Sequence, residues 1–200
     1  MATHPDAVIR YYPSDMVLNV HSDASYLTAP KARSRAGGHF FLGSIPKDGC
    51  PIRLNGAILT QCAILKCVAA SAAEAELGAL FLNAMDARII RLTLEEMGHP
   101  QPPTPIHVDN TTAVGIVNNT IKRQRSRAMN MRYFWLLCQE AQQILHIRYH
   151  TGQENLGDMP TENHSGAQTH RTRPFYLQTK QGPRLLPQAP WPSVRRGCVR

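Results

Sequence analysis

The sequence predicts an α/β protein in which a mixed five-stranded sheet is flanked by helices and followed by a disordered basic tail. Three features support this prediction. Three short runs of strand-forming residues come first and are joined by short loops. Helical and strand patterns then alternate, which is typical of parallel strands joined by helix crossovers. The last segment, residues 165–200, contains five prolines and no Asp or Glu.

The first three strands are expected at residues 16–22, 37–43 and 56–68. The first of them alternates apolar and polar residues and ends at Asp23, as expected of a strand with one buried face. Short connections between consecutive strands favour antiparallel pairing. These three strands are therefore expected to form an antiparallel meander.

A long helix is expected from Ser71 to about Met97. Its first turns are rich in alanine, which has the highest helix propensity. Leucines and further alanines recur at helical spacing and give the helix an apolar face. Gly98 and Pro100 follow and are expected to end it.

The rest of the chain alternates between strands and helices. The elements expected here are a strand at 106–108, a short helix through Val117, a helix at 126–143, a strand at 144–149 and a turn or short helix at 152–163. Helix crossovers join strands that run parallel, so the last two strands should be parallel to their neighbours. The whole sheet is therefore expected to be mixed.

The charge distribution separates one domain from a tail. The chain carries 22 Lys and Arg against 14 Asp and Glu, a formal net charge of +8. All the acidic residues precede residue 165. A basic, proline-rich segment without periodicity cannot bury enough apolar surface to fold. We expect a lead-in at residues 1–15, one folded domain at 16–165 and a disordered tail at 166–200.

The sequence lacks the features of a membrane or secreted protein. No stretch approaches the roughly 20 apolar residues needed to span a bilayer, and the N-terminus has no apolar core of the signal-peptide kind. The five cysteines are odd in number and lack CxxC spacing, so we expect reduced thiols rather than disulfides or a zinc site. These features favour an intracellular protein, in the cytoplasm or the nucleus.

Four acidic residues lie where the expected elements begin or end: Asp23, Glu74, Asp109 and Asp158. Carboxylates at element ends can converge on one spot, and a cluster of carboxylates is what Mg²⁺ requires, particularly when a substrate phosphate completes the ligand set. The sequence therefore favours metal-dependent cleavage of a phosphodiester.

Helix capping is the alternative for two of these acids. Asp109 begins an Asp-Asn-Thr-Thr segment that is rich in capping residues. Ser71-x-x-Glu74 matches a capping box, in which Glu74 would bond to the helix terminus. Glu76 lies roughly 200° around the helix from Glu74, so only one of the two can face a given site. We select Glu74 from the resemblance that follows.

These segments together resemble the ribonuclease H domain of Ty1/copia-type retrotransposon polyproteins. The resemblance covers about residues 5–175 in consistent order. The matching stretches are Ser22-Asp-Ala-Ser-Tyr-Leu27, Ser34-Arg-Ala-Gly-Gly-His-Phe-Phe41, Ser71-x-x-Glu-Ala-Glu76, Asp109-Asn-Thr-Thr-Ala113, Arg127-Ala-Met-Asn-Met-Arg132 and Glu154-Asn-Leu-Gly-Asp158.

The resemblance implies a ribonuclease H-like fold and an enzyme that cuts the RNA strand of an RNA/DNA hybrid. It implies an Asp-Glu-Asp-Asp active site that carries over to the four acids above and holds two Mg²⁺ ions, with Mn²⁺ as a substitute. It also implies a reverse transcriptase domain of the same element as partner and, for an intact element, a virus-like particle as location.

Two basic clusters are candidates for contacting the hybrid backbone. The first is preferred and comprises Lys122, Arg123, Arg125, Arg127 and Arg132. The second comprises Lys31, Arg33 and Arg35. The basic tail either tethers nucleic acid or extends beyond the usual end of the element.

The sequence departs from the family pattern at two places. The family usually has an aromatic residue where Leu77 stands, and it usually reads Ala-Asp-x-x-Thr-Lys where Gly157-Asp-Met-Pro-Thr-Glu162 stands. A histidine often precedes the last aspartate in cellular ribonucleases H, and His150 is the candidate here. These departures leave two alternatives open: a catalytically degenerate domain that binds nucleic acid without cutting it, and a nuclease of the same fold that acts on DNA.

Overall fold

The computed structural model of the chain describes residues 5–45, 47, 54–111, 114–115, 127–152 and 155–178, with only the backbone for residues 127–130. The elements follow in the order β1 (Val17–Ala29), β2 (Arg33–Gly43), β3 (Ala57–Ile64), α1 (Ala72–Glu96), β4 (Thr104–Val108), α3 (Arg127–Ala141), β5 (Leu145–Tyr149), the 3-10 turn η2 (Leu156–Asp158) and α4 (Gly166–Tyr176). None of the described helices combines the length and hydropathy needed to span a bilayer.

The five strands form one sheet in the order β3-β2-β1-β4-β5. The first three strands pair antiparallel, β4 pairs parallel with β1, and β5 pairs parallel with β4. The predicted mixed five-stranded sheet is therefore confirmed. The central strand β1 and its neighbour β4 run in the same direction, so their carboxyl ends lie at the same edge of the sheet.

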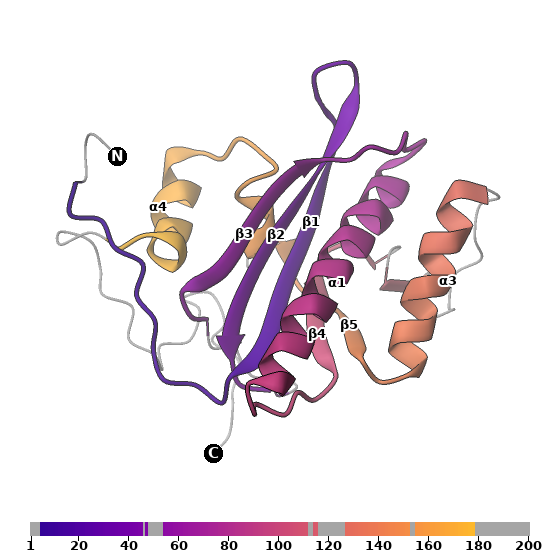
Figure 1. Ribbon diagram of the computed structural model, residues 1–200. Helices are drawn as coiled ribbons and strands as arrows, with labels where there is room; N and C mark the ends of the chain where they lie inside the picture. Colours follow the sequence, from indigo (N-terminus) through magenta and orange to yellow (C-terminus); the bar gives the residue numbers. More distant parts are fainter. Residues whose placement is uncertain are drawn as a thin grey trace.

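Helices cover the sheet on two faces (Figure 1). Helices α1 and α3 lie on one face, and α4 lies on the other. The main hydrophobic core fills the space between the sheet and α1 and α3, where Val20, Phe40, Leu80, Ile106 and Leu136 are fully buried. Burying one such side chain contributes about 1.5–3 kcal/mol. This core fixes β1, β4 and α1 relative to one another.

Strand β1 is longer than predicted, and Asp23 lies in its middle instead of at its end. The β1–β2 hairpin continues beyond the point at which β4 stops, because β1 pairs with β4 only through Val20 and His21. Asp23 therefore follows the end of the β1–β4 ladder while still paired with Gly37 of β2. Relative to β4, it occupies the position that the sequence predicted.

The long helix closely matches its prediction. Helix α1 runs from Ala72 to Glu96 with Ser71 as its N-cap, and Gly98 follows with a positive φ of 88°. The short helix expected after Asp109 is described only in part, where Thr111 and the pair Val114 and Gly115 are helical.

The prediction of a disordered tail from residue 166 is wrong for residues 166–178. Residues 166–176 form α4, with Ser165 as N-cap, and Gln178 pairs with Val8 in an isolated antiparallel bridge. Composition gave no sign of this helix because tertiary contacts stabilise it: Thr172 is buried, Tyr176 donates a hydrogen bond to the carbonyl of Leu156, and the Tyr176 ring packs against that of His39. Residues 179–200 lie outside the described residues.

Candidate metal centre

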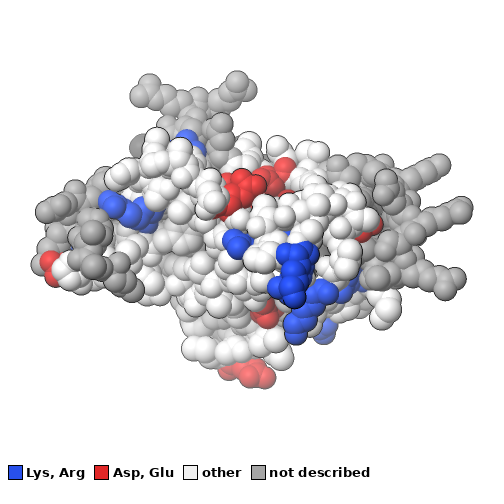
Figure 2. All heavy atoms as spheres, turned by 90° about the horizontal axis from the view of Figure 1, so that it is seen from above, with Lys and Arg blue, Asp and Glu red and all other residues white. Residues whose placement is uncertain are grey.

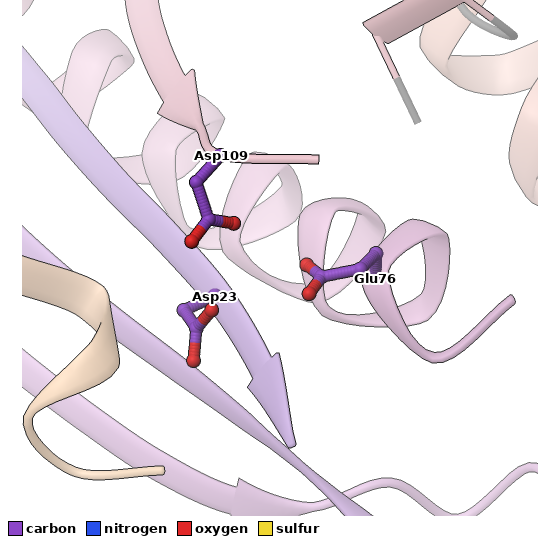
Figure 3. Close-up of side chains that lie close together, drawn as sticks. All are labelled: Asp23, Glu76 and Asp109. Carbon is purple, nitrogen blue, oxygen red and sulfur yellow. The ribbon is translucent and has the colours of Figure 1, made fainter. Parts of the chain in front are cut away.

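Three carboxylates from separate parts of the chain converge at the edge of the sheet where β1 and β4 end (Figure 3). They belong to Asp23 on β1, Asp109 immediately after β4, and Glu76 near the start of α1. One oxygen from each lies within 4.8 Å of the others. The sequence predicted that the carboxylates of Asp23 and Asp109 lie close together, and the parallel β1–β4 ladder brings them together.

The structure places Glu76, and not the predicted Glu74, in this group. Glu74 caps the helix: its backbone N–H donates to the Ser71 hydroxyl at 3.2 Å, and its carboxylate accepts from the Ala70 N–H at 2.9 Å. Glu76 lies on the other side of the helix and is only 8% exposed. The structure therefore does not bring Glu74 into the group, because its carboxylate accepts a hydrogen bond at the helix terminus.

The capping signature contained the information needed to find Glu76. A glutamate that closes a capping box cannot also reach a site on the opposite side of the helix. Once Ser71-x-x-Glu74 is assigned to capping, Glu76 is the acid that remains for the site. Its position near the N-terminus of α1 also suits a negative charge, because the helix dipole is positive there.

Burial and the closeness of the other negative charges raise the pKa of the carboxyl groups in this cluster. Burial raises the pKa of Glu76 to about 9, and the negative charges of Asp23 and Asp109 add to this effect. Burial raises the pKa of Asp23 to about 7, while a hydrogen bond from Thr161 opposes the rise. Burial likewise raises the pKa of Asp109. Crowded carboxylates of this kind either hold protons or bind a cation.

The donor set fits a hard divalent ion. It consists of carboxylate oxygens, which Mg²⁺ and Mn²⁺ prefer, with neither thiol nor imidazole among the three groups. One oxygen of Glu76, Oε2, is buried without a hydrogen-bond partner among the described atoms. A buried carboxylate oxygen without a donor is costly, and coordination to a cation would satisfy it.

A buried histidine precedes each of the two aspartates by two residues, His21 before Asp23 and His107 before Asp109. The rings of His21, His107 and His150 pack against one another with centroids 5.1–5.6 Å apart. Burial lowers the pKa of His21 and His107, the latter to about 3. His150, the histidine selected from the sequence, therefore packs against two buried rings next to the site.

Asp158 lies beside the group but is not part of it. It is half-buried in η2, and its charge contributes to the raised pKa values of Asp23 and Glu76. Burial raises the pKa of Asp158 itself, and His164, whose Nε2 lies 3.8 Å from Asp158 Oδ2, opposes the rise. Among the four predicted acids, the structure thus brings Asp23 and Asp109 together and leaves Asp158 at the rim.

Most residues of the preferred basic cluster lie outside the described part of the chain. Lys122, Arg123 and Arg125 lie outside the described residues, and only the backbone of Arg127 is described, at the start of α3. Arg132 follows on α3, and its guanidinium carbon lies 5.8 Å from the centroid of the Phe81 ring.

The second cluster surrounds the tip of the β1–β2 hairpin, where Lys31 and Arg33 are exposed and Arg35 is partly exposed. On the face of the molecule shown in Figure 2, several Asp and Glu form a patch near the centre, other acidic residues lie toward the edges, and Lys and Arg lie in separate groups. Exposed Lys and Arg side chains of this kind can attract the phosphates of a nucleic acid.

Comparisons with known proteins agree with this architecture. No protein-family model matches the chain. In sequence it is similar to the retrovirus-related Pol polyprotein from transposon TNT 1-94 of Nicotiana tabacum, at 26% identity over 149 residues, which is 74% of this chain. The matched region spans only 10% of that polyprotein.

In structure the chain is similar to LC11-RNase H1 isolated from compost, with a TM-score of 0.51 and 11% identity over 72% of this chain and 92% of the other. It is equally similar to LC11-RNase H1 in complex with an RNA/DNA hybrid, with a TM-score of 0.51 and 12% identity over 71% of this chain and 91% of the other. At such identities the likeness shows the fold. The predicted ribonuclease H-like fold and the resemblance to a retrotransposon polyprotein are therefore confirmed.

Proposed function

We propose that this chain is a metal-dependent endonuclease of the ribonuclease H type, derived from a Ty1/copia-type retrotransposon, that hydrolyses the RNA strand of RNA/DNA hybrids. The observation that carries the proposal is the convergence of Asp23, Glu76 and Asp109 within 4.8 Å. The fold shared with LC11-RNase H1, which has been solved with an RNA/DNA hybrid, supports the choice of substrate. The similarity to a retrotransposon Pol polyprotein supports the proposed retrotransposon origin. It also supports a reverse transcriptase domain as partner and a location inside the cell.

In this proposal the three clustered carboxylates hold the cations, and Asp158 adds a fourth from the rim. Two Mg²⁺ ions, or Mn²⁺ in their place, would supply the activated water and the stabilisation of the leaving 3′ oxygen. The role of the protein is to bring four acids to one place and to exclude competing ligands from it. No side-chain nucleophile is required, so the chemistry needs only the residues that the site provides.

The hybrid backbone would lie along the β1–β2 hairpin. Paired residues on adjacent strands share a face of the sheet, and faces alternate along each strand. Asp23 pairs with Gly37, and Ser25 with Arg35, so Arg35 lies on the same face as Asp23 and two residues further along. Two strand residues span about 6.6–6.8 Å. Arg35 is therefore placed to contact a phosphate close to the one that is cut.

Recognition of the RNA strand would depend on shape and on its 2′-hydroxyl groups. Ser25 lies on the same face as Asp23, but it is only 1% exposed and its hydroxyl oxygen is 2.5 Å from that of Thr28, so its hydroxyl is not available to the RNA strand.

A non-catalytic nucleic-acid-binding protein of the same fold is the second candidate. One observation favours it: Glu162 stands where the family has lysine, and its negative charge raises the pKa of Asp23, Asp109 and Asp158. A fifth acid close to the site makes it harder to keep the others ionised without a cation. Such a protein would bind a hybrid and leave it intact.

A cleavage assay separates the two candidates. The purified chain is incubated with a hybrid labelled on the RNA strand, in Mg²⁺ or Mn²⁺, beside Asp23→Asn and Asp109→Asn variants. The proposal predicts RNA fragments from the parent chain, none from the variants, and an intact duplex DNA control. Binding without cleavage would establish the second candidate, and cleavage of duplex DNA at a similar rate would show a nuclease without specificity for hybrids.

A further inference from the structure

The hydroxyl group of Thr161 lies against one oxygen of Asp23 inside the molecule. Thr161 is 2% exposed and Asp23 is 5% exposed. Thr161 Oγ1 donates a hydrogen bond to Asp23 Oδ2. Thr161 belongs to neither the helices nor the strands; it lies in the turn that follows η2.

The hydroxyl has one proton and two acceptors within reach. Besides Asp23, the carbonyl of Asp158 lies 2.9 Å from Thr161 Oγ1. That carbonyl already accepts from the backbone N–H groups of Thr161 and Glu162 at 3.1 and 3.2 Å, and His164 Nε2 lies 3.0 Å from it. A hydrogen bond to an ionised carboxylate is roughly twice as strong as one between neutral groups. The proton therefore points to Asp23 whenever Asp23 is ionised.

Strand β2 leaves room for this contact by having a glycine opposite Asp23. Gly37 is the register partner of Asp23. A Cβ atom at Gly37 would lie 2.3 Å from the carbonyl oxygen of Gly157 and 2.5 Å from Thr161 Cγ2. Any side chain at this position would push the turn away from β1. The glycine therefore allows Thr161 to reach the carboxylate.

Contacts that do not involve Thr161 hold the same segment against the sheet. Asn155 Nδ2 donates to the carbonyl of Ser22 at 2.9 Å, and the Leu156 N–H donates to His21 Nδ1 at 3.0 Å. The Tyr176 hydroxyl on α4 donates to the carbonyl of Leu156. The segment therefore has its own anchors, and the Thr161 hydroxyl is not needed to keep it in place.

We infer that Thr161 is a positioning residue for the metal centre. Its hydroxyl donates a hydrogen bond to Asp23 Oδ2 and so fixes the rotation of the carboxylate. Asp23 therefore faces Glu76 and Asp109 before any cation binds. This inference rests on the proposed function, because it treats the three acids as cation ligands. Partners that orient a ligand typically change metal affinity by roughly 10–100-fold.

The test compares Thr161→Val with Thr161→Ser. Valine keeps the shape of threonine and removes the hydroxyl, whereas serine keeps the hydroxyl and removes the methyl group. Mn²⁺ binding to each purified chain is measured by calorimetry, without substrate, and folding is checked by circular dichroism. We expect Thr161→Val to weaken Mn²⁺ binding by roughly 10-fold or more and Thr161→Ser to stay within about 2-fold of the parent. If the valine variant does not fold, Thr161→Ala removes the same hydroxyl with less bulk.

Tyr176→Phe is the matched control. It removes a hydroxyl that anchors the same segment but does not touch the three acids. We expect it to lower the melting temperature and leave Mn²⁺ affinity unchanged. An equal loss of affinity in Thr161→Val and Tyr176→Phe would overturn the inference, because it would show a general loosening of the segment. Unchanged affinity in Thr161→Val would overturn it as well.

The outcomes distinguish this inference from the proposed function. Failure of the parent chain to bind Mn²⁺ would overturn both. Binding by the parent that is lost in Asp23→Asn but unaffected by removal of the Thr161 hydroxyl would leave the proposed function standing and reject the positioning role alone.

Discussion

The three clustered acids and Asp158 are held by different parts of the molecule and in different ways. Asp23, Glu76 and Asp109 come from β1, α1 and the end of β4, which the hydrophobic core locks together. Asp158 comes from a three-residue 3-10 turn that hydrogen bonds attach to β1 and α4. The main core therefore positions three of the acids, whereas the turn that carries the fourth is held by the buried side chain of Leu156 and by polar contacts with β1 and α4.

This difference predicts how each acid responds to change. A ligand on core elements keeps its place when a neighbour is altered, so removing it affects the chemistry alone. A ligand on a polar-anchored turn can shift, and it contributes less when the other three are intact. The variants below test this ranking from the largest expected effect to the smallest.

Glu76→Gln should reduce cleavage more than any other variant below, and far more than Glu74→Gln. It removes one of the three clustered carboxylates. Removing a residue that merely orients a metal ligand lowers metal affinity or activity by roughly 10–100-fold, so the loss of a ligand itself should reduce the cleavage rate by more than ~100-fold. Glu74→Gln is the matched control, because glutamine keeps an acceptor oxygen for the Ala70 N–H. Equal losses in the two variants, measured with a labelled hybrid, would contradict the assignment of Glu76.

Asp158→Asn should reduce cleavage less than Glu76→Gln does. Asp158 lies at the rim, outside the group whose oxygens approach within 4.8 Å. A loss of roughly 10–100-fold is expected, similar to that for an outer partner of a metal ligand. Single-turnover cleavage rates measure it. A loss greater than that of Glu76→Gln would show that the turn, and not the core, supplies the principal ligand.

The stability of the metal-free protein should fall as the pH rises from about 5 to 9. The pKa of Asp23 is raised from 3.8 to about 7, and that of Glu76 from 4.5 to about 9. A carboxyl group with a raised pKa in the folded state contributes stability below its unfolded pKa, and this contribution is lost as the pH passes through the folded value. Melting temperatures in EDTA should therefore decline across this range.

Added Mg²⁺ should raise the melting temperature more at pH 8 than at pH 5, because ionised carboxylates bind it. Glu76→Gln should flatten the decline in EDTA, whereas Glu74→Gln should leave it as in the parent chain. A melting temperature in EDTA that rises between pH 5 and 9 in the parent chain would show that the cluster is compensated by charges elsewhere.

Arg35→Gln should have the smallest effect and should act on binding. It removes one cation from the face of the hairpin that carries Asp23, and it should lower hybrid affinity a few-fold and reduce the salt dependence of binding by about one phosphate contact. Arg88→Gln, at an exposed position on α1, is the control. Fluorescence anisotropy at several salt concentrations measures both. Equal slopes in the two variants would remove Arg35 from the binding surface.

Much of this architecture could be predicted because local patterns and short connections determine it. The meander, the crossover helix after it and the parallel strands follow from strand alternation and loop lengths, and the pairing of Asp23 with Asp109 follows from the parallel ends of β1 and β4. The choice of Glu74 rested on the family likeness, and the structure instead brings Glu76 to the group, because the Glu74 carboxylate accepts a hydrogen bond at the helix terminus.

Two features depended on contacts that no local pattern reveals. Helix α4 lies in a basic segment without apolar periodicity, and the ring of its Tyr176 packs against that of His39 on β2, with centroids 4.7 Å apart. The link between Thr161 and Asp23 joins residues 138 positions apart. Gly37, opposite Asp23, was a possible sign of this contact, since a glycine inside a strand can mark the close approach of another backbone.

Anomalous diffraction from crystals grown with Mn²⁺ tests the central claim most directly. The account predicts anomalous density within about 2.0–2.6 Å of carboxylate oxygens of Asp23, Glu76 and Asp109, and the loss of that density in Glu76→Gln but not in Glu74→Gln. Density at Glu74, or no density near the three acids when Mn²⁺ is saturating, would contradict it.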